Sequence, residues 1–183
     1  MKRQIRNSVF ETNSSSTHSI AISKKNPVIG KYIHFRIGEF GWENGCVDTA
    51  DYLYTAILEQ DNRDDLLNRL KEILNSYSIE YEFDEPLWHE SYDGEDKCLG
   101  YGYVDHSYEL IEFLNTILSN EDLLMRYLFG DSNVYTGNDN QDSCPAGCNI
   151  ADRTTWEYEN GKYIEMPNPY HDPENYDYFF KGN

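Results

Sequence analysis

The 183-residue chain has the composition of a folded protein and a large excess of negative charge. Hydrophobic residues make up 39% of it and aromatic residues 15%, which argues against a disordered chain. No apolar run approaches the ~20 residues that a membrane-spanning helix needs, so no membrane partner is expected. The formal net charge of -18 favours a basic protein surface or bound cations as partners of the acidic side chains.

The charge is unevenly distributed along the chain. Seven of the 15 basic side chains and one of the 33 acidic ones lie in residues 1–36, which leaves a balance of −24 for residues 37–183. We expect a single domain over residues 1–183, with a basic N-terminal segment and an acidic body. The N-terminal residues lack the apolar core of a signal peptide, which predicts a cytoplasmic protein with thiols or metal ligands rather than disulfides.

Two strands are predicted near the N-terminus. In residues 18–23 and again in residues 32–37, apolar side chains alternate with small or polar ones. Asn26 and Pro27 predict a turn between them. The following stretch GEFGWENG is punctuated by glycines and predicts a loop over residues 38–45.

Helices are predicted in the middle of the chain. Asp48 and Asn62 can each cap a helix, because both precede runs with apolar residues at helical spacing. A third helix is expected from about Ser107. Asn120 then begins a short fourth helix that ends near Gly130.

Strand patterns also follow the second helix and the fourth. Residues 79–84 alternate as a half-buried strand, and residues 134–135 predict a short strand. Asn160 and Gly161 suit a type I′ turn between aromatic-rich strands. The tail, residues 167–183, is aromatic and acidic, and its packing stays open.

Together these elements predict an α+β fold. We expect a single domain with a mixed or antiparallel sheet, a group of three to four helices in the middle of the chain and a C-terminal β-hairpin.

The stretch ETNSSSTHS, residues 11–19, gathers hydroxyl, amide and imidazole side chains close to basic residues. One interpretation is a hydrogen-bonded polar turn at the edge of the sheet. A second is a phosphate or nucleic-acid site, although the glycines of a P-loop are missing. A third is a small phosphate- or nucleotide-handling enzyme that uses the Ser14–His18 cluster, in which case residues 14–18 and 137–140 would meet in a cleft. The candidate phosphate-binding residues are Arg3, Arg6, Ser14, Ser15, Ser16, Thr17 and His18.

Metal ligands are less clearly indicated. Cys144 and Cys148 lie four residues apart in CPAGC and are the candidates for zinc, but a second short-spaced pair of ligands is missing. The carboxylate-rich segments do not follow the calcium-loop pattern. We therefore predict no metal, no cofactor and no assigned catalytic residue.

One acidic segment is regular enough to suggest a function. Along the predicted strand over residues 79–84, alternate carboxylates share one face with a spacing of ~6.6 Å. Such a row imitates the charges of a nucleic-acid strand and would attract a basic DNA-binding groove. The alternative is a sheet face that simply points at water. The candidate partner-binding residues are Glu80, Glu82, Asp84, Glu85, Glu90, Asp93, Glu95 and Asp96.

Three stretches resemble those of small phage and prophage proteins of Gram-positive bacteria: IRNSVFETNSSSTHSI (5–20), GEFGWE (38–43) and YTGNDN (135–140). We expect this group to include a type II-A anti-CRISPR protein. The resemblance implies a stoichiometric inhibitor that acts in the cytoplasm of the bacterial host on a Cas9-type nuclease with its guide RNA. It carries over no functional residue. The basic N-terminal segment could then contact DNA or RNA, and a phage accessory protein without a ligand stays open as an alternative.

Overall fold

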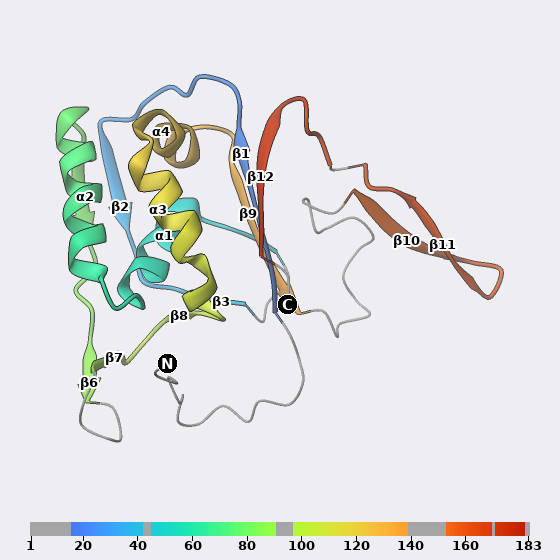
Figure 1. Ribbon diagram of the computed structural model, residues 1–183, viewed down its shortest axis with the longest axis horizontal. Coiled ribbons are helices and arrows are strands. Elements are labelled where there is room, and N and C mark those ends of the chain that lie inside the picture. The colour runs from blue at the N-terminus through green and yellow to red at the C-terminus, as the bar shows by residue number, and fades with distance from the viewer. Residues whose placement is uncertain (1–15, 42–44, 91–96, 139–152, 170, 182–183) are drawn as a thin grey trace.

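The computed structural model describes an α+β fold (Figure 1). The described residues are 16–41, 45–90, 97–138, 153–169 and 171–181. Their α-helices lie in the middle of the chain, as predicted: α1 (Thr49–Leu58), α2 (Arg63–Ser76), α3 (Ile111–Ser119) and α4 (Glu121–Phe129). Within this part of the chain, no helix is long and apolar enough to cross a membrane.

The largest sheet is antiparallel and includes strands from both ends of the described chain. Its strand order is β12 (Tyr176–Lys181), β1 (Ser16–Ser23), β9 (Asn133–Asn138) and β4 (Gly45–Val47). The tail thus supplies strand β12, which settles the question that its sequence left open. Because β1 pairs on both sides, residues 16–19 belong to an inner strand. For these residues the predicted turn at the sheet edge was wrong.

The remaining strands form small two-stranded sheets. Two of these are parallel, β2 (Tyr32–Phe35) with β5 (Glu80–Phe83) and β3 (Glu39–Phe40) with β8 (Tyr103–Val104). Two are antiparallel, β6 (Trp88–Glu90) with β7 (Lys97–Leu99) and β10 (Thr154–Glu159) with β11 (Lys162–Pro167).

The predicted loop over residues 38–45 holds strand β3 and the first residue of β4, so that prediction was wrong in part. Glycine makes the approach of β3 to β8 possible. Gly102 has a φ of 80°, and a Cβ there would lie 2.8 Å from the carbonyl oxygen of Gly38. The absence of a side chain at Gly102 therefore lets β8 approach β3, a role that the loop prediction did not include.

The helix termini follow the predicted caps closely. The Asp48 carboxylate accepts hydrogen bonds from the N–H groups of Ala50 and Asp51, and the Asn120 side chain accepts one from Leu123. Asn62 occupies the N-cap position of α2, but its side chain makes no capping hydrogen bond. The predicted third helix begins as a 3₁₀ turn, η1 (Ser107–Leu110), before α3.

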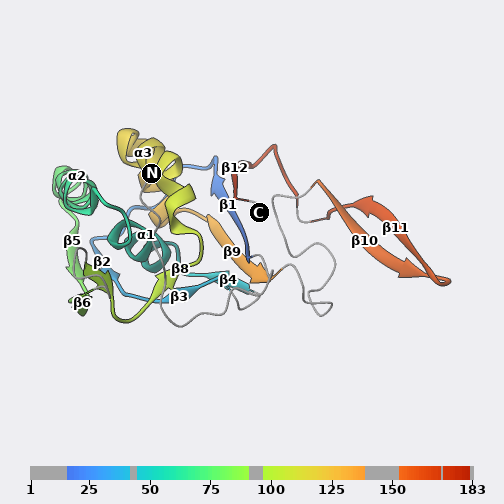
Figure 2. The same ribbon diagram turned by 60° about the horizontal axis from the view of Figure 1, so that its bottom comes forward.

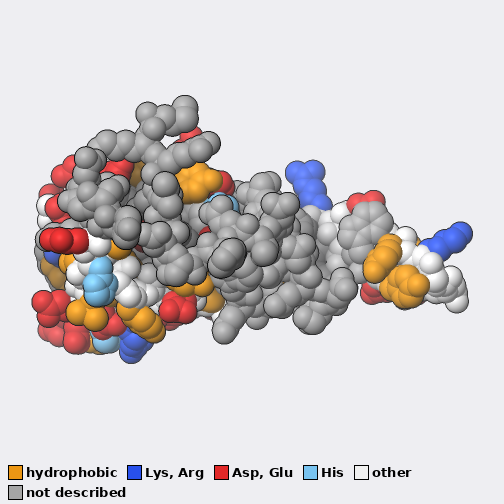
Figure 3. Space-filling model, turned by 90° about the horizontal axis from the view of Figure 1, so that it is seen from below, with side chains coloured by type: hydrophobic (Ala, Val, Ile, Leu, Met, Phe, Trp, Pro, Cys, Tyr) orange, Lys and Arg blue, Asp and Glu red, His pale blue; other side chains and the backbone are white. Residues whose placement is uncertain are grey.

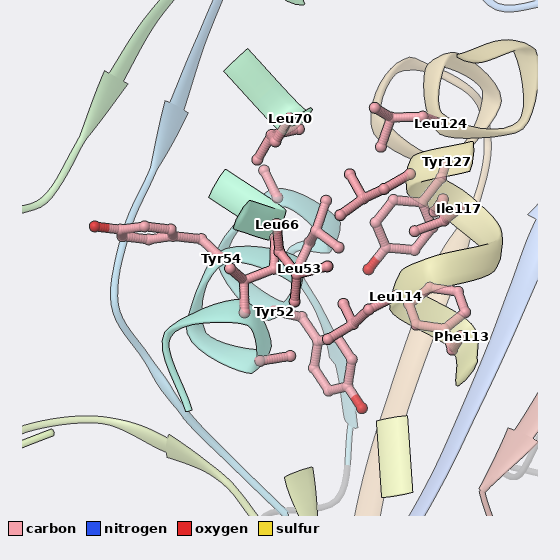
Figure 4. Close-up of a cluster of buried hydrophobic side chains, with 14 of the residues drawn as sticks. Tyr52, Leu53, Tyr54, Leu66, Leu70, Phe113, Leu114, Ile117, Leu124 and Tyr127 are labelled. Carbon is pink, nitrogen blue, oxygen red and sulfur yellow. The ribbon is translucent and has the colours of Figure 1, made fainter. Parts of the chain in front are cut away.

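The core lies between the helices and one face of the central sheet (Figures 2 and 4). Figure 4 shows Leu53 of α1 and Leu114 and Ile117 of α3 pointing toward one another, and all three are fully buried. Burial of one such side chain contributes roughly 1.5–3 kcal/mol. The core therefore fixes α1, which carries side chains that reach both candidate sites described below.

The C-terminal hairpin was predicted correctly. Asn160 and Gly161 have φ values of 51° and 81°, as both central residues of a type I′ turn require. Strands β10 and β11 project away from the helices (Figure 1). Every residue of β11 is exposed.

Candidate functional site

Strand β5 presents its carboxylates to solvent, as the alternating pattern predicted. Glu80 and Glu82 are exposed, whereas Tyr81 and Phe83 are partly buried and pack against the core. We call Glu80, Glu82 and Asp84 the acidic row. Because alternate strand residues share a face, Glu80 and Glu82 lie on one side of β5, and the strand advances ~6.6 Å from one to the other. Asp84 follows β5 directly and is partly buried.

Side chains of the neighbouring strand hold two of the three carboxylates in place. The Tyr32 hydroxyl donates to the Glu82 carboxylate at 2.7 Å. The Nε2 atom of His34 lies 2.9 Å from Oδ1 of Asp84, and the Ile37 N–H donates to Oδ2 of Asp84 at 3.3 Å. The strand predicted over residues 32–37 ends at residue 35 in the structure. The next two N–H groups, of Arg36 and Ile37, donate to the carboxylates of Asp51 and Asp84.

These hydrogen bonds orient the acidic row. The hydrogen bond to Glu82 raises the pKa of Tyr32, with smaller contributions from desolvation and the Glu82 charge. The phenol therefore stays a neutral donor. Among the described residues, the Glu80 side chain makes no hydrogen bond, so its carboxylate is available to a partner.

Further acidic side chains surround the row. Glu85 and Glu90 are exposed, and Figure 3 shows acidic side chains gathered at the end of the molecule that holds α2, β5 and β6. Asp93, Glu95 and Asp96, which the sequence assigned to the same surface, lie outside the described residues.

Three basic side chains of α2 are engaged within the fold. Arg63 stacks over the Trp88 ring at 4.4 Å, and Lys71 lies 5.5 Å from the centre of the Phe83 ring. Arg69 forms ion pairs at 3.3 Å with Glu72 and with Glu121 on α4, and it donates to a carbonyl of α3. These contacts hold the three cations against α2 and its neighbours.

A second polar cluster lies on β1, at the opposite side of α1. The Nδ1 atom of His18 is 3.0 Å from the Tyr52 hydroxyl, and its Nε2 atom is 3.2 Å from the Ser16 hydroxyl. We call Ser16, His18 and Tyr52 the imidazole cluster. All three residues are buried, with 0% exposure at His18 and Tyr52. Ser16 and His18 touch because alternate residues of a strand share a face.

The hydrogen bonds of this cluster join polar groups inside the fold. Burial raises the pKa of Tyr52 far above its ordinary value, so the phenol keeps its proton. Nδ1 of His18 lies within hydrogen-bond distance of this hydroxyl, and Nε2 lies within hydrogen-bond distance of Ser16. The burial of Ser16 and His18 leaves a substrate little access to them.

The stretches over residues 5–20, 38–43 and 135–140 meet at this cluster in their described parts. Ser16 lies opposite Asn138 and His18 opposite Thr136 in the β1–β9 pair. Thr136 also pairs with Gly45 of β4, and the Phe40 ring of β3 packs on the Tyr52 ring at 5.5 Å. The expected meeting of residues 14–18 with 137–140 is therefore seen for residues 16–18 and 137–138. These described residues form part of the sheet and the core.

The other candidates from the sequence lie outside the described residues. These are Arg3, Arg6, Ser14 and Ser15 of the proposed phosphate site and Cys144 and Cys148 of the proposed zinc site. Thr17 is half-buried on β1. In the described ranges, Cys46 and Cys98 are exposed free thiols, and no three His, Cys, Asp or Glu side chains are arranged to hold a metal ion.

Sequence reasoning missed the roles of Tyr32 and His34, which position the acidic row. The signal was present, because both lie on the polar face of an alternating strand. What the sequence could not supply was the parallel pairing of β2 with β5, which sets His34 opposite Glu82 and next to Asp84.

Comparison of the chain with protein-family models, with curated proteins and with solved structures found no match.

Proposed function

We propose that this chain is a phage-derived acidic inhibitor that binds a guide-loaded Cas9-type nuclease and blocks its DNA binding or its cleavage. The observation that carries the proposal is the acidic row on the exposed face of β5. Nucleases of this class hold nucleic acid in positively charged channels and read DNA next to the target with arginines. A regular row of carboxylates can compete for such cations as a nucleic-acid strand does.

Two further features support the proposal. Tyr32 and His34 hold Glu82 and Asp84 in fixed positions, so less conformational entropy is lost when a cation binds to the row. Arg63, Arg69 and Lys71 of α2 are each held by a partner within the fold, which limits how far they can neutralise the acidic row. The resemblance to phage proteins supplies the class of target.

The first test is cleavage of a target plasmid at increasing ratios of this protein to guide-loaded nuclease. An inhibitor that acts by occupancy reaches its full effect near stoichiometric amounts. Inhibition far below that ratio would instead require turnover, as an enzyme provides. Absence of inhibition across several Cas9 orthologues would exclude the proposed target.

A charge-reversal pair identifies the surface that binds. We expect Glu80→Lys with Glu82→Lys to weaken binding at least about tenfold and to flatten its salt dependence, because two contacts with cations are lost. The matched control is Glu157→Lys with Glu159→Lys on the exposed hairpin strand β10, which changes the net charge and the spacing of charges identically. Asp84 is left unchanged, because it also bonds to the fold. Equal weakening by both pairs would assign the effect to net charge alone.

The alternative, a phosphate- or nucleotide-handling enzyme, is favoured by one observation: the hydrogen bond between Ser16 and His18 beside β9. Burial of both residues weighs against it. If Ser16→Ala abolished a phosphate- or nucleotide-dependent activity of the folded protein while inhibition of the nuclease was absent, this alternative would replace the inhibitor.

A further inference from the structure

Strand β5 has an unpaired edge. In the described residues its sheet contains β2 and β5 alone. The backbone N–H groups of Glu80 and Asp84 donate to carbonyl oxygens of the β2 segment, each at 2.9 Å. Because these groups alternate in direction along a strand, those of Tyr81 and Phe83 point away from β2. Among the described residues, β5 pairs with no strand on that side.

The unpaired edge lies at the margin of the molecule. Figure 2 shows β5 on the outer side of β2, at the end farthest from the β10–β11 hairpin. An open strand edge offers its N–H and C=O groups as a template for another strand. The two faces beside this edge differ, since Glu80 and Glu82 are exposed on one face, while Tyr81 and Phe83 pack toward the core on the other.

We propose that β5 accepts an extended segment of a basic partner protein as a third strand of the β2–β5 sheet. Backbone hydrogen bonds to Tyr81 and Phe83 would hold the segment in register. Its lysines or arginines alternate with apolar residues, so that each cation lies beside a carboxylate of the acidic row and the apolar residues lie beside the aromatic face. The inference rests on the proposed function for the partner and adds the mode of binding.

Charge selects a basic segment over a second copy of this chain. Pairing two β5 edges would bring two acidic rows together in a protein whose net charge is already -18, and like charges directly opposite destabilise a strand pair. Carboxylates on an edge strand are a known protection against self-pairing. The same side chains attract a strand of opposite charge, which makes the edge selective.

A proline substitution tests the backbone contact separately from the charges. Tyr81→Pro removes an N–H that the β2–β5 pair does not use, and proline is tolerated on edge strands where its missing N–H faces solvent. Tyr81→Ala is the matched control, because it loses the same ring and keeps the N–H. The probe is a short synthetic peptide of alternating lysine and valine, and the control peptide has the same composition with its lysines in one block.

We expect the alternating peptide to bind the Tyr81→Ala variant at least about tenfold more tightly than it binds the Tyr81→Pro variant. The alternating peptide should also bind Tyr81→Ala more tightly than the control peptide does. Hydrogen exchange on the unaltered protein gives a second readout that needs no variant. Bound peptide should slow exchange of the Tyr81 and Phe83 amides at least about tenfold. Equal affinity of the two variants, or unchanged exchange at saturating peptide, would overturn strand addition.

The same variants with guide-loaded nuclease separate this inference from the proposed function. If nuclease binds both variants equally, strand addition fails and the inhibitor proposal stands. If nuclease does not bind but the peptide results hold, the edge is a docking site for a different basic protein. If the protein dimerises through an edge that Tyr81→Pro blocks, a second copy is the occupant and the proposal is wrong.

Discussion

The acidic row and the imidazole cluster use similar side chains in opposite ways. A histidine on a strand and a tyrosine hydroxyl make hydrogen bonds in each region, and helix α1 lies between the two regions. His18 is fully buried, whereas 23% of the His34 side chain is exposed. In the cluster the polar groups satisfy one another inside the core. In the row they orient carboxylates that still face solvent, so burial decides whether a polar group is enclosed by the fold or stays accessible.

The largest expected difference between the two regions concerns their histidines. His18→Ala should lower the free energy of unfolding by about 3–5 kcal/mol, because it leaves a cavity and a buried Tyr52 hydroxyl without an acceptor. His34→Ala removes a partly exposed contact with Asp84 and should cost below about 1 kcal/mol. Urea denaturation followed by circular dichroism measures both.

A small effect at His18 would contradict this comparison. It would mean that the imidazole cluster is loosely held, and its hydroxyl and imidazole groups would again be candidates for a ligand. Ser16→Ala in the same assay sharpens the result, since it removes the hydroxyl that contacts Nε2 of His18 without opening a ring-sized cavity.

The sequence predicted local structure better than it predicted neighbours. Alternation and capping located the helices and the strand of the acidic row, because both signals are short-range. The pairing of β1 with β9, which brings His18 beside Thr136, depends on contacts between residues more than a hundred positions apart. Such contacts leave no periodic signal in one chain. The turn predicted for residues 16–19 failed because small hydroxyl residues also fit a buried inner strand when each finds a partner.

A smaller effect distinguishes the tyrosines of α1 by pH. Burial, with a contribution from Asp84, raises the pKa of Tyr54 to about 12. Its hydroxyl donates to the Asp84 carbonyl oxygen at 2.7 Å. In the unfolded chain the phenol ionises near pH ~10. The folded state therefore keeps this proton longer, and its contribution to stability, complete below pH ~10, is lost as the pH rises to about 12.

Tyr54→Phe checks this expectation. The variant should be less stable than the unaltered protein at neutral pH, and its free energy of unfolding should fall less steeply between pH ~10 and 12. Tyrosinate absorbance, measured for the variant and for the unaltered protein, gives an independent measurement. If the free energy of unfolding fell equally steeply with pH in the variant and the unaltered protein, the Tyr54 hydroxyl would be in solvent. The hydrogen bond from α1 to Asp84 of the acidic row would then be absent.

The smallest effect on stability is expected at Glu80. A substitution there distinguishes most directly between a surface that binds a partner and a surface that stabilises the fold. Glu80→Gln preserves size and removes one charge from a protein with a net charge of -18, so the free energy of unfolding should stay within about 0.5 kcal/mol or rise slightly. Binding to guide-loaded nuclease should weaken severalfold and lose part of its salt dependence. A loss of stability without any change in binding would show that the acidic row serves the β2–β5 sheet itself, and the difference between the two regions would then lie only in their exposure.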